Sequence, residues 1–185
     1  MPHADALLAL MRSDTERQRI LTLVYSLDLP DCWIAAGFVR SAVWDSLHGR
    51  PASLPCADID VIWFDPQSGK DVDLQIEERL KRLDDSLAWS VKNQSRMHSG
   101  NGDSPYQSAS DAMRFWPETA TATAIRYAAG GNLEIAAPFC LDDLYGALVR
   151  PTPRFQHDKR ALFDERVKRK KWLPQWPLLR VVEPG

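Results

Sequence analysis

Cysteine is scarce in this chain, with three residues in 185: Cys32, Cys56 and Cys140. Their wide spacing matches neither a disulfide framework nor a zinc site. No apolar run approaches the length of a membrane span, and the amino terminus lacks the basic and apolar regions of a secretion signal. We therefore expect a cytoplasmic protein in a reducing environment, without insertion into a membrane.

An excess of positive charge is also missing, because the formal net charge is −2. Charge alone therefore gives no reason to expect tight non-specific binding to nucleic acid. A glycine-rich phosphate loop and a dinucleotide fingerprint are absent as well, since Gly130 and Gly131 fall in an expected hairpin turn. Hydrophobic residues make up 44% and charged residues 26% of the chain. This composition is typical of a globular protein with one core.

Helical and strand-like segments alternate along the chain and predict an α/β (α+β) fold, a mixed β-sheet with flanking helices. We expect an N-terminal helical segment over 1–30, a core over 31–150, and a C-terminal helix with a Pro- and Trp-rich strap over 151–185. The polar stretch 98–111 is expected to be a mobile loop. Trp172 and Trp176 are expected to pack the strap over the body of the protein.

The segment CADIDVIWFD contains Asp58 and Asp60 within a run of β-branched and aromatic residues. Side chains alternate along a strand, so the two carboxylates should leave the same face of the sheet and repel each other. A hard divalent cation, Mg²⁺ or Mn²⁺, would remove that repulsion. An edge strand whose aspartates face water would explain the same spacing. Gly37 is expected at the junction of a short strand and a helix. Glycine and a helix start let a phosphate approach the backbone, so Gly37 favours the metal-site interpretation of the two aspartates.

The stretches AAGFVRSAVWDSLHGRP and ADIDV resemble the polymerase-β-like nucleotidyltransferase superfamily. They are most similar to the branch with CCA-adding tRNA nucleotidyltransferases and bacterial poly(A) polymerases, where Gly-Gly-x-Val-Arg-Asp opens the helix. Phe38 stands in place of the second glycine or serine, and Ser41 in place of the aspartate. Over residues 33–153 the chain also resembles a family of small bacterial nucleotidyltransferase-like proteins. The resemblance implies a Mg-dependent enzyme that transfers NMP from an NTP to a hydroxyl acceptor and releases pyrophosphate.

The candidate site follows from the residues and the resemblance together. Asp58 and Asp60 are the expected catalytic metal ligands, and Glu134 is the third carboxylate, as metal ligand or general base. A solvent-facing strand residue is the alternative for Glu134. The expected nucleotide-binding residues are Gly37, Phe38, Arg40, Lys92, Asn93 and Arg96.

Several of these residues have a second interpretation. Arg40 could form a structural ion pair, and the polar cluster from Lys92 to His98 could be a solvated loop. Glu118, Thr119 and Thr121 could line the same cleft. The basic run from Arg166 to Trp172 is more typical of a solvated helix end than of a polyanion site.

The expected partners are an NTP and an acceptor that is a small molecule, an RNA end or a protein hydroxyl, with no membrane involved. The acceptor, the base preference and the oligomeric state are open. Two other functions fit the same residues. One is a catalytically inactive nucleotide-binding or regulatory module, which Phe38 favours. The other is a structural partner protein whose acidic pair is incidental.

Overall fold

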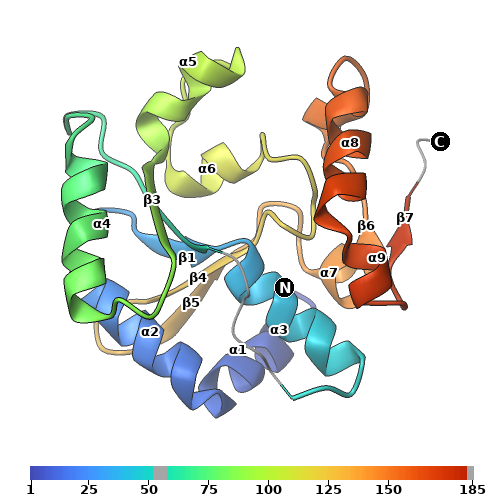
Figure 1. The fold of residues 1–185 in the computed structure, drawn as a ribbon, viewed down its shortest axis with the longest axis horizontal. Helices are drawn as coiled ribbons and strands as arrows, with labels where there is room; N and C mark the ends of the chain where they lie inside the picture. The colour runs from blue at the N-terminus through green and yellow to red at the C-terminus, as the bar shows by residue number, and fades with distance from the viewer. Residues whose placement is uncertain (52–57, 183–185) are drawn as a thin grey trace.

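The computed structural model describes residues 1–51 and 58–182, so Cys56 lies outside the described residues. Five strands form one mixed sheet in the order β3-β2-β1-β4-β5, in which only β2 and β3 run parallel. The helix α4 connects these two strands (Figure 1). The strands of this sheet are β1 (Trp33–Ala35), β2 (Ile59–Trp63), β3 (Trp89–Asn93), β4 (Ala124–Tyr127) and β5 (Leu133–Ala136). The predicted mixed sheet with flanking helices is confirmed.

Strand β2 carries different side chains on its two faces. Ile59, Val61 and Trp63 point into the main core, where each is at most 2% exposed. Asp60 and Ile62 therefore point to the opposite face, because strand side chains alternate. Asp60 lies in register with Ala35 of β1 and Ser90 of β3. Between these small neighbours Asp60 is partly buried.

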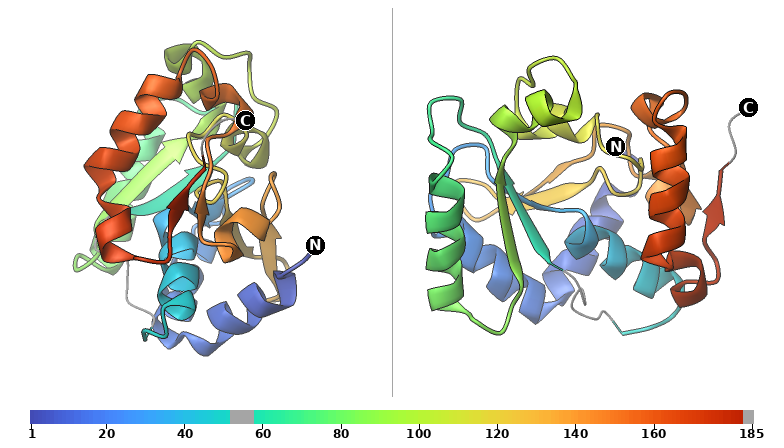
Figure 2. Two further views of the ribbon diagram at one scale, coloured as in Figure 1. Left: turned by 90° about the vertical axis from the view of Figure 1, so that its right-hand side faces the viewer. Right: turned by 45° about the horizontal axis from the view of Figure 1, so that its top comes forward.

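Helices cover the main-core face, and a smaller layer covers part of the other face (Figure 2). The first four helices pack on the main core, and α6 packs against the other face through Ala109 and Met113. The helices are α1 (Ala4–Ser13), α2 (Thr15–Tyr25), α3 (Gly37–Leu47), α4 (Val72–Leu83), α5 (Met97–Asn101), α6 (Ala109–Met113), α7 (Asp142–Tyr145), α8 (Arg160–Lys170) and α9 (Trp172–Gln175), with 3-10 turns at Gln94–Arg96 and Pro153–Phe155. None of the helices in the described ranges is long and apolar enough to cross a membrane.

The expected loop over 98–111 is only partly found, because α5 and α6 occupy its two ends and residues 102–108 alone connect them. Two local contacts explain the order. The Ser108 side chain accepts a hydrogen bond from the Asp111 backbone N–H at the start of α6. The buried Tyr106 donates its hydroxyl to Asp103 at 2.8 Å and packs its ring against Phe115. The segment consequently forms one wall above the sheet.

Two tryptophans of the C-terminal segment, which we call the strap, pack against α3. The rings of Trp172 and Trp176 lie edge-on to Trp44, with centroid distances of 5.6 and 5.1 Å. The indole Nε1 of Trp176 donates to Asp45 at 2.8 Å in the interior. Beyond this contact β7 (Arg180–Val181) pairs with β6 (Leu148–Val149) in a separate two-stranded sheet. The strap therefore holds α8 in place beside the main sheet.

Candidate active site

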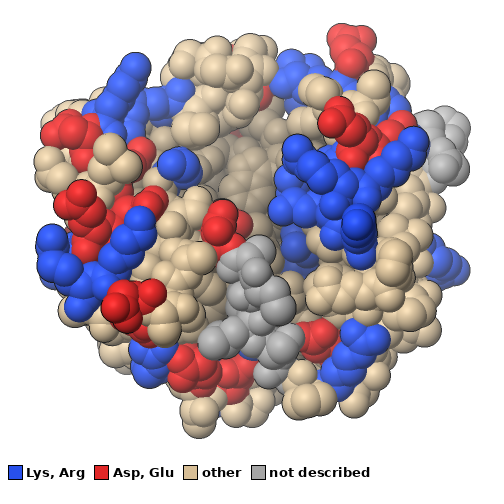
Figure 3. Space-filling view, in the orientation of Figure 1, with Lys and Arg blue, Asp and Glu red and all other residues tan. Residues whose placement is uncertain are grey.

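A cleft of about 340 Å³ opens on the sheet face that carries Asp60. Its walls come from β2, β3, the start of α3, the segment 94–101, the turn around 116–121, and α8. Figure 3 shows this face hollowed, with Lys and Arg side chains gathered over α8. The volume lies within the range of small-molecule sites, roughly 300–1,000 Å³.

Asp58 and Asp60 both line the cleft. Asp58 precedes β2 and is exposed, whereas Asp60 lies within the strand and is partly buried. Burial, and next the charge of Asp58, raise the pKa of the Asp60 carboxyl above its usual value. Arg40, Lys170 and Arg166 oppose that rise only in part. The pair is therefore a site of unfavourable negative charge that a cation would relieve.

Arg40 reaches the same cleft from α3, although it is only 7% exposed. Its guanidinium lies 4.4 Å from the ring centroid of Trp172 and donates to the Thr121 hydroxyl at 2.8 Å. Its Nε has no hydrogen-bond partner within the described residues. Burial is the main reason that the pKa of Arg40 falls to about 10. Arg40 thus lines the same cleft as Asp60, with Thr121 as its hydrogen-bond partner in the cleft wall.

Two further cations come from α8, in the basic run that the sequence suggested was a solvated helix end. Arg166 and Lys170 line the cleft. Burial, and then the charges of Arg166 and Arg40, lower the pKa of Lys170. The buried Glu118 accepts a hydrogen bond from Arg166 Nε at 2.7 Å, and its other carboxylate oxygen has no partner within the described residues. The buried Glu118 thus pairs with Arg166 and also raises the pKa of Arg40 against the effect of burial, while Lys170 lies close enough to both cations to be repelled by them.

The sequence contains a signal for these α8 residues. Phe163, Arg166, Val167 and Lys170 follow the i, i+3, i+4, i+7 spacing of one helix face. Phe163 and Val167 are buried in the main core, so the cations beside them must lie at its border. Recognising this required knowing that the apolar positions of the helix pack against the core.

The turn before α3 corrects the expectation for Phe38. Gly37 begins the helix, at the junction where the sequence placed it, and lines the cleft. Phe38 is fully buried and points into the core, where the guanidinium of Arg17 lies 5.4 Å from its ring centroid. The residue with the unusual backbone is Ala36, with φ 54° and ψ −118°. In this turn the backbone conformation that glycine adopts most easily is therefore found at Ala36, which also lines the cleft.

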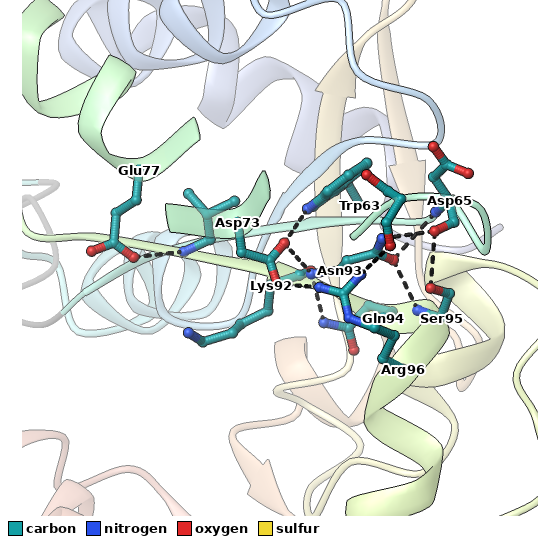
Figure 4. A network of polar contacts seen from close by, with 11 residues as sticks. Trp63, Asp65, Asp73, Glu77, Lys92, Asn93, Gln94, Ser95 and Arg96 are labelled. Atoms are coloured by element: carbon teal, nitrogen blue, oxygen red, sulfur yellow. Dashed lines mark hydrogen bonds and ion pairs between the residues drawn. The ribbon is translucent and has the colours of Figure 1, made fainter. Parts of the chain in front are cut away.

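The predicted cluster at the end of β3 divides into two parts (Figure 4). Lys92 is exposed and lines the cleft. Asn93 is fully buried, and its side chain hydrogen-bonds the backbone of Asp65 and Ser95. Arg96 donates to Asp73 at 2.7 Å, and Asp73 also accepts from the backbone N–H of Asn93. Asn93 and Arg96 thus hold the end of β3 in place and do not line the cleft.

Glu134 does not join the acidic pair. It lies on β5, three strands from β2 in the sheet order, which corresponds to roughly 14 Å at about 4.8 Å per strand. Its carboxylate is 46% exposed and pairs with Arg126 at 2.7 Å. Over residues 1–51 and 58–182, no group of three His, Cys, Asp or Glu side chains could hold a metal ion together. The expected three-carboxylate site is therefore not formed there.

The residues present still fit a divalent cation. Asp58 and Asp60 supply hard oxygen donors, and Mg²⁺ commonly binds one or two carboxylates while water and substrate phosphates complete its shell. The cationic side chains of Arg40, Arg166 and Lys170, which line the same cleft, are suited to substrate phosphates. One cleft thus combines an acidic edge and a basic wall.

Comparison of the sequence and fold with known proteins identifies the family of this chain. A family model described as nucleotidyltransferase matches residues 22–181. The chain belongs to this nucleotidyltransferase family. An NMR structure described as a CCA-adding enzyme head domain is 33% identical, with a TM-score of 0.86, over 96% of this chain and 95% of that one. No match was found among curated proteins.

More distant structures share the nucleotidyltransferase fold. A CCA-adding enzyme in complex with CTP has 17% identity and a TM-score of 0.58, over 97% of this chain and 43% of that one. A tRNA-processing enzyme has 16% identity and a TM-score of 0.54, over 89% and 42%. This nucleotidyltransferase spans less than half the length of these two proteins. The family expected from the Gly37 turn and the Asp-x-Asp strand is confirmed.

Proposed function

We propose that this protein is a divalent-metal-dependent nucleotidyltransferase that moves a nucleoside monophosphate from an NTP to an acceptor hydroxyl. The observation that carries the proposal is the cleft in which Asp58 and Asp60 face Arg40, Arg166 and Lys170. The two carboxylates are suited to bind a metal ion, and the three cationic side chains are suited to bind a polyphosphate. Together they are complementary to a metal–NTP complex. The related CCA-adding enzymes solved with ATP and CTP support this substrate class.

Each part of the cleft has a role in this reaction. Asp58 and Asp60 would hold Mg²⁺ or Mn²⁺, which would supply the positive charge that neutralises phosphate and stabilises the attacking and leaving oxygens. Arg40, Arg166 and Lys170 bind the phosphates and stabilise the negative charge of the departing pyrophosphate. The acceptor oxygen forms a bond to the α-phosphorus as the bond to the pyrophosphate oxygen breaks, and the proton of the acceptor hydroxyl is released to solvent. Glu134 has no part in this arrangement.

The alternative of a catalytically inactive nucleotide-binding module loses its sequence argument. That argument rested on Phe38 in the phosphate turn, and Phe38 is a core residue. The acceptor remains an RNA end, a small molecule or a protein hydroxyl, because each offers the same attacking group.

Thermal unfolding with each of the four NTPs, with and without Mg²⁺, tests the proposal. A ligand at 100 times its Kd stabilises the folded state by about 2.7 kcal/mol. For a chain of this size that corresponds to a rise in Tm of roughly 5–10 °C. We expect the rise only when an NTP and Mg²⁺ are both present, and we expect it to vanish in Asp58→Ala/Asp60→Ala.

The matched control is Asp142→Ala, which removes an exposed carboxylate whose side chain is 64% accessible. This variant should keep the full Tm rise. Catalysis is then measured as pyrophosphate release when RNA, small-molecule or protein fractions are added as acceptors. Absence of any Mg-dependent NTP effect in the wild type would refute the proposal, and binding without release for every acceptor class would establish the inactive module.

A further inference from the structure

The cleft has a second, apolar end. Ile62 follows Asp60 by two residues on β2 and faces the cleft roughly 6.6 Å further along the strand. Met97, Trp116 and Pro117 line the cleft together with Ile62, and Lys92 lies beside Ile62 on β3. Arg40, Arg166 and Lys170 lie close enough to Asp60 to affect its pKa. A ligand that fills the whole cleft is therefore anionic near Asp60 and contacts apolar side chains, with Lys92 beside them, near Ile62.

Trp116 is held firmly at this apolar end. Its backbone N–H donates to the Met113 carbonyl at 3.1 Å, and its own carbonyl accepts from the Thr152 hydroxyl at 2.6 Å. Its ring is partly buried against the smaller core layer that includes Ile62. Met97, 38% exposed, lines the same cleft with a flexible thioether side chain. A fixed aromatic ring and an adaptable side chain together suit a flat ring system.

Gln94 adds a hydrogen-bonding group to the cleft. It is only 5% exposed, and its Nε2 donates to the Lys92 carbonyl at 3.2 Å. That contact leaves its oxygen Oε1 without a partner among the described residues. The buried Asn93 network fixes the backbone on either side of Gln94 (Figure 4). An amide that is nine-tenths buried, rigidly held and lining a cleft is a ready acceptor for a ligand N–H group.

We propose that this end of the cleft is the nucleobase subsite, in which Trp116 and Met97 contact the base and Gln94 Oε1 accepts a hydrogen bond from its exocyclic amino group. The inference rests on the proposed function, because it takes the anionic end to be the triphosphate site. Adenine and cytosine carry an amino group where hypoxanthine and uracil carry a carbonyl. Gln94 therefore favours ATP over ITP and CTP over UTP.

The test is isothermal titration of the full chain with Mg²⁺ and inorganic tripolyphosphate, ATP, ITP, CTP or UTP. Stacking of a base on an aromatic side chain corresponds to roughly ten- to a hundredfold in affinity. We expect ATP to bind more tightly than tripolyphosphate by about that factor, and Trp116→Ala to remove most of the difference. One hydrogen bond corresponds to roughly 3- to 10-fold, so the ATP/ITP and CTP/UTP ratios should be of this size.

Gln94→Leu should reduce both ratios to about one while tripolyphosphate binding stays unchanged. The matched control is Gln107→Leu, because Gln107 is exposed and its Nε2 also donates to a backbone carbonyl two residues earlier. This control should keep the wild-type ratios. If ATP binds no more tightly than tripolyphosphate, or if the ratios survive in Gln94→Leu, the nucleobase subsite is refuted while the phosphate site stands. If tripolyphosphate and every NTP fail to bind, the proposed function itself is refuted.

Discussion

Replacing Asp60 with asparagine should stabilise the ligand-free protein while abolishing its response to metal and nucleotide. Burial and the charge of Asp58 both raise the pKa of Asp60, so the fold favours the protonated form. At neutral pH the ionised carboxylate therefore costs folding free energy. Asn removes the charge, keeps the shape of the side chain, and leaves Asp58 without a repelling neighbour.

The size of the effect follows from the strand geometry. Asp58 directly precedes β2, and residues two apart in an extended chain lie about 6.6 Å apart. Two unit charges at that distance repel by roughly 2.5 kcal/mol when the effective dielectric constant is about 20. Asp58 is exposed, so solvent screening reduces this to about 1 kcal/mol. For a chain of this size, Asp60→Asn should raise Tm by roughly 2–4 °C.

The pH dependence has a definite sign. Below the unfolded-state pKa of about 3.9, Asp60 is protonated in both states and the substitution should change little. As the pH rises through the higher folded-state pKa, the wild type loses stability that Asp60→Asn retains. The difference in Tm, measured by calorimetry from pH 4 to pH 8, should therefore grow and then level off.

A carboxylate with the opposite environment serves as the control. Asp103 has a 2% exposed side chain and accepts from Arg154 Nε at 2.7 Å. Asp103→Asn should lower Tm, because it removes a charge that the fold stabilises. If Asp60→Asn also lowers Tm at neutral pH, Asp60 has a structural partner and the repulsion argument is wrong.

Three other substitutions test the fold and the corrected site. Ala36→Val should lower the free energy of unfolding by more than about 2 kcal/mol in denaturant titration, whereas Ala36→Gly should change it by less than about 1 kcal/mol, because φ is 54° at this turn. Trp176→Ala should lower the free energy of unfolding by about 3–5 kcal/mol, because Trp176 is 3% exposed and its indole donates to Asp45. A decrease of less than about 1 kcal/mol would contradict the packing of the strap. Glu134→Gln should leave the Mg-dependent NTP shift in Tm intact and change stability by less than about 0.5 kcal/mol, since its ion pair with Arg126 is partly exposed; loss of the shift would return Glu134 to the site.

Local patterns were sufficient for much of the fold and for the acidic half of the site. The alternation of Ile59, Asp60 and Val61 predicted a strand with one apolar and one acidic face, and this is what the structure shows. Such patterns are reliable because the period of two is a property of the strand backbone itself. The hairpin around Gly130 was predictable for the same reason, as two β-rich runs flank a short turn.

The local pattern failed where two interpretations had equal sequence support. Phe38 and Asn93 belong to motifs that suggested nucleotide contacts, yet both are fully buried in structural roles. The backbone strain falls at Ala36, one residue before the glycine that the sequence highlighted. Neither burial nor a positive φ at alanine can be read from residue types alone.

The sequence by itself determined the family, the Asp-x-Asp strand and the helix that begins at Gly37. Only the tertiary structure decided which distant groups complete the cleft: it brings Arg166 and Lys170 to Asp60 and keeps Glu134 three strands away. The physical reason is that strand order and helix docking are set by packing between residues far apart in the chain. Trp172 and Trp176 must bury their rings against α3, and α8 is thereby fixed with its cations facing the acidic pair.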